Sequence, residues 1–214
     1  MSKHIDAVIW DFGGVISSSP FDAFNAYEAE NGLPKDFIRS VNARDPDTNA
    51  WARLERSELD ANSFDTAFRS ESEAMGHAVP GKDILALLSG QLRPRVIDAL
   101  RACKANAKVG CITNNAPVGK GASMTRDEAK AARVAEVFTL FDHVIESAKA
   151  GIRKPDPRIY ELMCEALQVD PSRCVYLDDL GINLKPARAM GMTTIKVLNE
   201  EQLLSDLSAA TGFF

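Results

Sequence analysis

The sequence predicts a doubly wound α/β fold, a parallel sheet with helices on both faces, and a small helical cap inserted after the first strand. Two observations predict it. Five short apolar runs rich in β-branched residues alternate with helical stretches, which is typical of a parallel sheet. The segment between the first and second runs is long, helical in character and without a strand signal.

The five expected strands are nearly continuous apolar segments, the pattern of strands that are buried on both faces. They are Ile5–Trp10, Lys108–Thr113, His143–Glu146, Cys174–Leu177 and Thr193–Leu198. Among the helices between them, one is expected over residues 156–169, because Asp156 is a good N-cap and Pro157 suits the first helical position.

The helical cap is expected over residues 17–90. Helical segments fit near 21–31, 34–43, 47–56 and 62–75, which is far more chain than a simple crossover needs. We therefore expect a Rossmann-like core of residues 1–16 and 91–214. The cap should lie above the C-terminal edge of the sheet, where open α/β sheets bind ligands.

The charge of the chain is concentrated in this cap. The whole sequence has 25 basic and 30 acidic residues, a net charge of −5, whereas residues 17–90 alone have 7 basic and 13 acidic residues. Without a basic stripe, nucleic-acid binding is not expected. Without an apolar stretch of about 18 residues or a basic amphipathic helix, no membrane association is expected either.

The cysteines predict a reducing environment. None of the four, Cys103, Cys111, Cys164 and Cys174, lies in a CxxC pair or in a zinc-binding pattern. Together with an N-terminus that lacks the features of a signal peptide, this predicts a cytoplasmic protein. The sequence leaves open whether it is a monomer or a homodimer.

Polar side chains follow three of the expected strands. Asp11 follows the first, Thr113 and Asn114 end the second, and Asp178 and Asp179 end the fourth. The carboxyl ends of parallel strands meet at one sheet edge, so these side chains should converge there.

Lys154, which precedes the Asp156 helix, should join them. Clustered carboxylates repel one another unless a cation such as Mg²⁺, which prefers oxygen ligands, lies among them. Lys154 and the Thr113 hydroxyl then suit the oxygens of a phosphoryl group, and a carboxylate is a suitable nucleophile for phosphoryl transfer.

With these segments in order, the sequence resembles the haloacid dehalogenase superfamily. The resembling segments are VIWDFGGV, CITNN, GIRKPDPRIY and VYLDDLGINLKPARAMGM. Together they span nearly the whole chain, and they are far more specific in combination than singly. The last segment is similar to the N-terminal phosphatase domain of soluble epoxide hydrolases and to a domain fused to some acyl-CoA dehydrogenases.

The resemblance implies a role for each residue. Asp11 would be the nucleophile and a Mg²⁺ ligand, with the backbone carbonyl of Gly13 and the side chain of Asp179 as further ligands. Thr113, Asn114 and Lys154 would bind the phosphoryl group of a small phosphorylated substrate, and Lys154 would neutralise its charge. The two supporting residues would be Asp178 and Asn183.

Gly13 is the main departure from the family pattern. Phosphatases of the superfamily usually have a second Asp two residues after the nucleophile, where it transfers protons to and from the leaving group. Its absence leaves three possibilities: a phosphatase restricted to good leaving groups, a proton supplied by Asp22, Arg44, Asp45 or Glu55 of the cap, or a weak or non-catalytic binder of a phosphorylated ligand.

A 2-haloacid dehalogenase is a further alternative. It also lacks the second Asp, and its nucleophile attacks carbon without a metal. Dehalogenases of the superfamily do not as a rule have the Asp178–Asp179 pair, which favours the phosphatase over this alternative.

Overall fold

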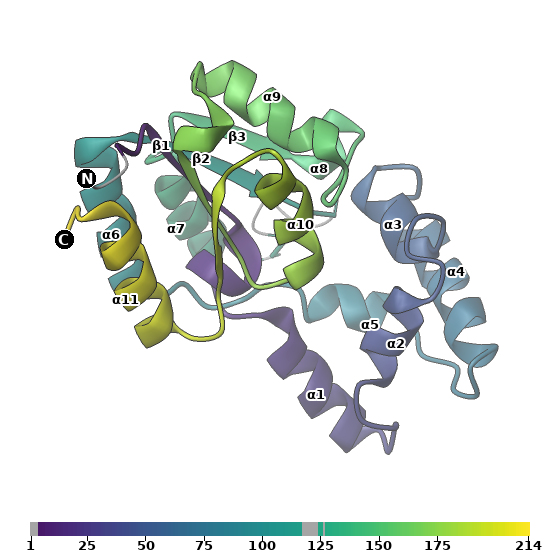
Figure 1. The fold of residues 1–214 in the computed structure, drawn as a ribbon. Helices are drawn as coiled ribbons and strands as arrows, with labels where there is room; N and C mark the ends of the chain where they lie inside the picture. Colours follow the sequence, from purple (N-terminus) through teal and green to yellow (C-terminus); the bar gives the residue numbers. More distant parts are fainter. Residues whose placement is uncertain (1–3, 117–123, 126) are drawn as a thin grey trace.

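The chain folds around one parallel sheet. The structure, a computed structural model, describes residues 4–116, 124–125 and 127–214. The strands are β1 (Ala7–Trp10), β2 (Lys108–Thr113), β3 (His143–Glu146), β4 (Cys174–Asp178) and β5 (Thr193–Lys196). They pair in the order β3-β2-β1-β4-β5, all parallel (Figure 1), so β1 lies at the centre. The predicted α/β fold is confirmed.

Helices cover both faces of the sheet. One face packs against α6 (Pro94–Asn106), α7 (Glu128–Phe138) and α11 (Glu200–Thr211), and the other against α9 (Pro157–Leu167) and α10 (Gly181–Ala189). Two short elements, α8 (Ser147–Ala150) and the 3₁₀ turn η3 (Pro171–Arg173), connect strands and helices. No helix within the described ranges is both long enough and apolar enough to cross a membrane.

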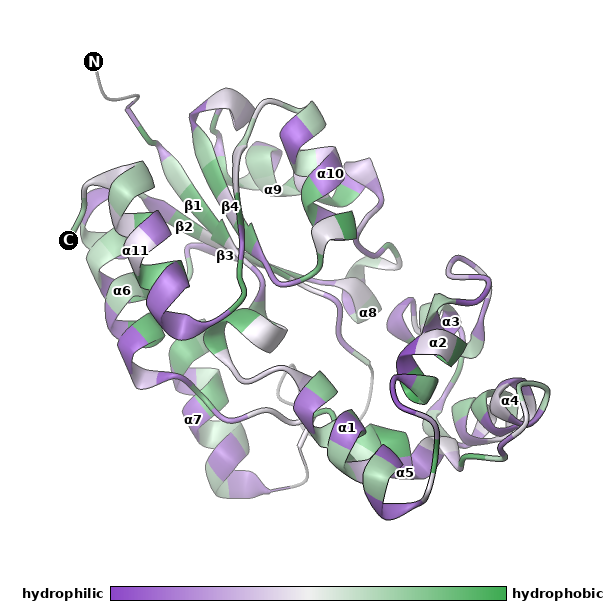
Figure 2. Ribbon diagram, turned by 60° about the horizontal axis from the view of Figure 1, so that its bottom comes forward, coloured by the Kyte–Doolittle hydropathy of each residue, from purple (hydrophilic) through white to green (hydrophobic). Residues whose placement is uncertain are grey.

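The side chains of β1 point alternately to the two faces of the sheet, which explains why helices must cover both faces. Val8 and Trp10 point into the layer with α6 and α11, while Ala7 and Ile9 point into the layer with α9 and α10. All four are fully buried. Figure 2 accordingly shows hydrophobic residues along the strands, and an apolar strand of this kind is stable only at the centre of a sheet covered on both faces.

Helix α9 begins where the sequence predicts. Asp156 is its N-cap and accepts a hydrogen bond from the backbone N–H of Arg158, and Pro157 occupies the first turn. The predicted strands β1 and β5 are each two residues too long. Ile5 and Asp6 precede the paired residues of β1, and Val197 and Leu198 follow those of β5.

Residues 20–86 form five helices beside the carboxyl edge of the sheet (Figure 1). They are α1 (Pro20–Glu30), α2 (Phe37–Ala43), α3 (Ala50–Glu55), α4 (Ala61–Glu73) and α5 (Gly81–Ala86). The first four lie near the predicted helical segments. The fifth was not predicted, and it begins with a glycine, a weak helix former.

These five helices have an apolar core of their own. Phe24, Ile38, Leu54, Phe64 and Phe68 are buried within it. The chain enters and leaves through two adjacent segments, which pair at Ser17 and Leu92 in an isolated antiparallel bridge. We propose on this basis that residues 17–90 are a cap domain, and that residues 1–16 and 91–214 are the core domain.

The turn after β1 contains two glycines with different surroundings. It runs over Phe12–Ile16, and Gly14 has a φ of 78°, in the left-handed region that favours glycine. A Cβ atom on Gly14 would lie 2.1 Å from Oδ2 of Asp179, whereas a Cβ atom on Gly13 would meet nothing within 4 Å. Gly14 therefore permits the close approach of the turn to Asp179.

We expect Gly14→Ala to lower the free energy of unfolding by more than about 1 kcal/mol, because the left-handed backbone and the clash with Asp179 both oppose a side chain. Gly13→Ala is the matched control and should change it by less than about 0.5 kcal/mol. Urea unfolding followed by circular dichroism measures both values. Equal losses in the two variants would contradict this account of the turn.

Candidate active site

The centre of the site is the buried ammonium group of Lys154. Its Nζ lies 2.8 Å from Oδ1 of Asp11 and 2.8 Å from Oδ2 of Asp178. Lys154 is 1 % exposed. Burial alone lowers the pKa of a lysine, but here the two carboxylates outweigh burial and raise the pKa of Lys154 above its usual value. The side chain is therefore a permanent cation between two strand ends.

Asp11 is placed at the middle of the sheet edge because it follows the central strand. Its Oδ1 accepts hydrogen bonds from the backbone N–H of Phe12, at 2.6 Å, and from Lys154. These two donors fix the orientation of the carboxylate at one of its oxygens. The second oxygen, Oδ2, is the one we consider below as a nucleophile.

Asp178 uses both of its oxygens within the protein. Oδ1 accepts from the backbone N–H of Leu180 at 2.8 Å, and Oδ2 accepts from the hydroxyl of Tyr176 at 2.5 Å and from Lys154. Nδ2 of Asn183 lies 3.1 Å from each oxygen. A fully buried carboxylate with this many donors acts as a fixed anion that holds Lys154.

The carboxylates of Asp11, Asp178 and Asp179 form one cluster. An oxygen of each lies within 4.8 Å of an oxygen of the other two. Burial and the charge of Asp178 raise the pKa of Asp179 to about 6, although Lys154 opposes the shift. Burial also raises the pKa of Asp11, which Lys154 again opposes and the other two carboxylates reinforce. Ionising both side chains at neutral pH therefore costs free energy.

A divalent cation fits this cluster by the chemistry of its donors. Three carboxylates face a single ammonium group, so the cluster has an excess of negative charge. All its donor atoms are oxygens, which suit Mg²⁺. Because Asp178 is already bonded at both oxygens, Asp11 and Asp179 are the side chains available to a metal.

Asn114 contacts the backbone of Lys154. Its Oδ1 accepts from the N–H of Lys154 at 2.9 Å, and its Nδ2 donates to the carbonyl of Lys154 at 3.0 Å. The sequence predicts that Asn114 binds the phosphoryl group. The contacts observed give it a positioning role, because they fix the backbone of the lysine. Thr113 is buried at the end of β2, beside the central strand.

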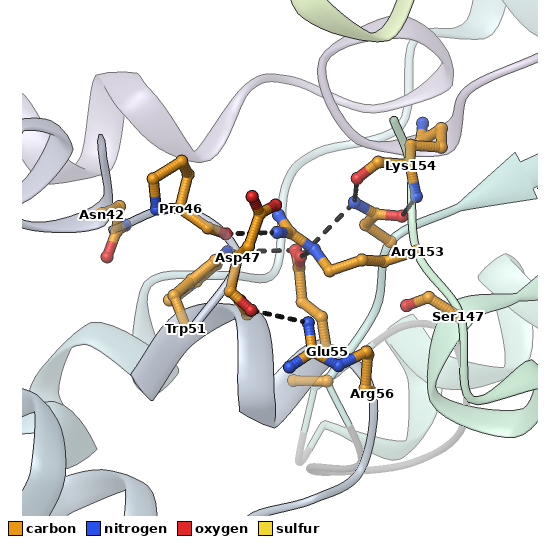
Figure 3. A network of polar contacts seen from close by, with 12 residues as sticks. Asn42, Pro46, Asp47, Trp51, Glu55, Arg56, Ser147, Arg153 and Lys154 are labelled. Carbon is orange, nitrogen blue, oxygen red and sulfur yellow. Dashed lines mark hydrogen bonds and ion pairs between the residues drawn. The ribbon is translucent and has the colours of Figure 1, made fainter. Parts of the chain in front are cut away.

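Sequence reasoning missed three residues around the site. Tyr176 supports Asp178, and Tyr160 donates a hydrogen bond from its hydroxyl to the carbonyl of Asn183 at 2.7 Å. Arg153 forms an ion pair with Glu55 of α3 (Figure 3). A signal existed for Tyr176, which lies two residues before Asp178 in a strand and so faces the same side. None existed for the pairing of Arg153 with Glu55, which are 98 residues apart.

The chain is similar to parts of several larger proteins. Acyl-CoA dehydrogenase family member 10 of Mus musculus is 34 % identical over 213 residues, covering 97 % of this chain and 19 % of the relative. Bifunctional epoxide hydrolase 2 of Mus musculus is 32 % identical over 214 residues, 95 % of this chain and 38 % of the relative. The chain thus spans less than half the length of both. A phosphatase of Mycobacterium tuberculosis is 33 % identical over 112 residues, 51 % of this chain and 47 % of the relative.

Solved structures share the fold. A HAD family enzyme of Bacteroides thetaiotaomicron, in complex with magnesium and inorganic phosphate, superposes with a TM-score of 0.61 at 20 % identity and covers 94 % of this chain and 98 % of its own. The L-2-haloacid dehalogenase of Xanthobacter autotrophicus gives a TM-score of 0.61 at 21 % identity, covering 97 % and 84 %. At these identities the likeness concerns the fold alone.

The family of haloacid dehalogenase-like hydrolases matches residues 5–191. This range includes Asp11, Lys154, Asp178 and helices α1–α5. This match covers most of the chain, and it agrees with the resemblance seen in the sequence. The chain belongs to the haloacid dehalogenase-like hydrolases.

Proposed function

We propose that the protein is a Mg²⁺-dependent phosphatase that hydrolyses a small phosphorylated metabolite through an aspartyl-phosphate on Asp11. The observation that carries this proposal is the buried ammonium of Lys154 at 2.8 Å from Asp11. A fixed cation beside a carboxylate nucleophile can offset the charge of a phosphoryl group. The similarity to a mycobacterial phosphatase supports the same function.

The reaction follows from the contacts of Asp11. Its Oδ1 is held by Phe12 and Lys154, so Oδ2 attacks phosphorus, forming an O–P bond as the bond from phosphorus to the leaving oxygen breaks. Lys154 favours the ionised form of the carboxylate and neutralises the charge that develops next to it. Water then attacks the phosphoryl group, which releases inorganic phosphate and restores the carboxylate.

The metal would be held by Asp11, Asp179 and the backbone carbonyl of Gly13. When bound, Mg²⁺ would supply charge neutralisation to the phosphoryl oxygens. The raised pKa values of Asp11 and Asp179 support a metal at this place, because a cation removes the repulsion that raises them.

Gly13 restricts the leaving group in this proposal. With no side chain at this position to protonate a departing alkoxide, we expect better activity on acyl, aryl or anomeric phosphates, whose leaving groups need less help. A second candidate, a weak or non-catalytic binder of a phosphorylated ligand, rests on the same missing side chain. The cytoplasmic location and the monomeric or homodimeric state remain predictions.

We expect the wild-type protein to hydrolyse an aryl phosphate only with Mg²⁺, and Asp11→Asn to remove the activity, because an amide oxygen is a poor nucleophile. Release of the aryl alcohol, measured by absorbance, checks this. The control is Asp98→Asn, the same substitution at an exposed residue of α6. Equal rates for Asp11→Asn and wild type would contradict the mechanism, and halide release from a 2-haloacid in the presence of a chelator would favour the dehalogenase.

Mg²⁺ should stabilise the folded protein. At about 100 times its Kd, a ligand adds about 2.7 kcal/mol, which raises the melting temperature by roughly 5–10 °C in a domain of this size. Asp179→Asn should abolish this rise. A monovalent salt of equal ionic strength is the control, and a rise of equal size in Asp179→Asn would contradict the assignment of Asp179 as a ligand.

Without metal, Asp179→Asn should be more stable than wild type by on the order of 1–3 kcal/mol at pH 7, because it removes a carboxylate whose pKa is raised to about 6 by burial and by Asp178. A carboxyl group whose pKa is raised in the folded state destabilises the fold at pH values above its pKa in the unfolded state, and not at lower pH. The gain should therefore shrink as the pH falls from 7 towards 4. A gain that is constant across this range would contradict the charge repulsion.

Gly13→Asp should raise the turnover of alkyl phosphates by about 10²–10⁴-fold, and that of acyl phosphates far less, because only the poor leaving group needs a proton. A Cβ atom at Gly13 would meet nothing within 4 Å, so the first atom of the new side chain causes no clash. Gly13→Asn introduces a side chain of nearly the same shape that cannot transfer a proton, and it is the matched control. Initial rates on the two substrate classes decide the matter, and a gain shared by both would count against a leaving-group restriction.

A further inference from the structure

A carboxylate of the cap lies against the loop that presents Lys154. Glu55, the last residue of α3, is 6 % exposed, and its Oε2 lies 2.5 Å from Nε of Arg153 (Figure 3). The same oxygen lies 3.4 Å from Nδ2 of Asn114. Its other oxygen, Oε1, accepts from the indole N–H of Trp51 at 3.0 Å. Glu55 thus links helix α3 to two residues of the core.

The two core residues that Glu55 contacts are the ones that hold the backbone of Lys154. Arg153 directly precedes the lysine, and Asn114 makes both a donor and an acceptor hydrogen bond with the lysine backbone. The lysine side chain then reaches Asp11. An unbroken series of contacts therefore runs from a cap carboxylate to the nucleophile.

The ion pair between Arg153 and Glu55 is less exposed than the ion pair between Arg56 and Glu58 within the cap. The side chains of Arg153 and Glu55 are 18 % and 8 % exposed, whereas those of Arg56 and Glu58 are 22 % and 48 % exposed. Removing one partner of a buried pair leaves an uncompensated charge, which is costly. An exposed pair contributes little.

Two further hydrogen bonds join the cap to the same part of the core. Nη1 of Arg153 donates to the carbonyl of Pro46 at 2.9 Å (Figure 3), and the hydroxyl of Ser57 donates to the carbonyl of Ala148 at 2.7 Å. With Glu55 on the same segment, α3 and its flanking residues form a polar contact beside the site.

We propose that Glu55 is a positioning residue for Lys154: by binding Arg153 and Asn114, it makes the geometry of the phosphoryl site depend on the docked cap. The inference rests on the proposed function of that site. Three N–H groups, from Trp51, Arg153 and Asn114, point at the two oxygens of Glu55, so its observed contacts are those of a carboxylate that fixes its neighbours.

The test compares Glu55→Gln, Arg153→Gln and the double variant, with Glu58→Gln as the matched control. Gln at position 55 is a severe change despite its size, because its NH₂ group must face either the indole N–H of Trp51 or the donors of Arg153 and Asn114. Glu58 contacts Arg53 and Arg56 only within the cap, so its substitution leaves the core contact intact.

We expect Glu55→Gln to lower kcat for an aryl phosphate by roughly tenfold or more, with a smaller change in KM, because Lys154 acts on the charge that develops during reaction. Arg153→Gln should add little in the Glu55→Gln background, with a non-additivity of about 5- to 100-fold. Glu58→Gln should match the wild type. Strictly additive effects, or an unchanged kcat in Glu55→Gln, would overturn the proposal.

A second measurement does not depend on activity. The N–H of Lys154 donates to Asn114, so its hydrogen-exchange rate reports on the positioning directly. Exchange should be at least about tenfold faster in Glu55→Gln than in wild type or Glu58→Gln. Equal exchange in all three would overturn the positioning role, even if kcat changed.

The two measurements separate the two proposals. If the wild type hydrolyses no aryl phosphate, the proposed function is wrong, while faster exchange in Glu55→Gln still supports the positioning of Lys154. Urea unfolding of each variant shows whether a fall in kcat comes only from a smaller fraction of folded protein. A fall in kcat that only follows the folded fraction would overturn the proposal.

Discussion

The rest of the site depends on the two ion pairs that the ammonium group of Lys154 forms with Asp11 and Asp178. Burying a lysine is costly unless anions compensate it, and here two strand ends supply them. The same pair of contacts connects the central strand β1, its neighbour β4 and the loop before α9. The order of the strands places β1 beside β4, so the fold itself creates this arrangement.

The remaining polar contacts follow from that pair. A fully buried Asp178 needs donors on both oxygens, and Tyr176, Leu180 and Asn183 provide them. Asn114 then fixes the backbone of the lysine. What these contacts leave uncompensated is the charge of Asp179, whose raised pKa reports the cost. A site whose clustered charges cost stability is a common compromise between stability and function.

The sequence predicted well what depends on local pattern. Apolar runs located the strands, and the polar residues after them identified Asp11 and Asp178 as neighbours at one sheet edge. It predicted poorly what depends on distant pairs or weak patterns. Helix α5 begins with a glycine, a weak helix former, and the contact between Glu55 and Arg153 joins residues 98 positions apart. Asn114 was recognised as part of the site, but only the fold shows that it bonds to the Lys154 backbone and to the side chain of Glu55.

The packing of the cap explains why a few polar contacts matter. Its buried cluster consists of residues from α1–α5 and the segments that join them, with Ala116 and the partly buried Met124 as members from the core. Within the described part of the chain, few apolar side chains of the core thus belong to this cluster. Hydrogen bonds and ion pairs therefore contribute to the docked position. Those contacts lie next to Lys154, so the polar interactions that seat the cap are also the ones best placed to affect the reaction.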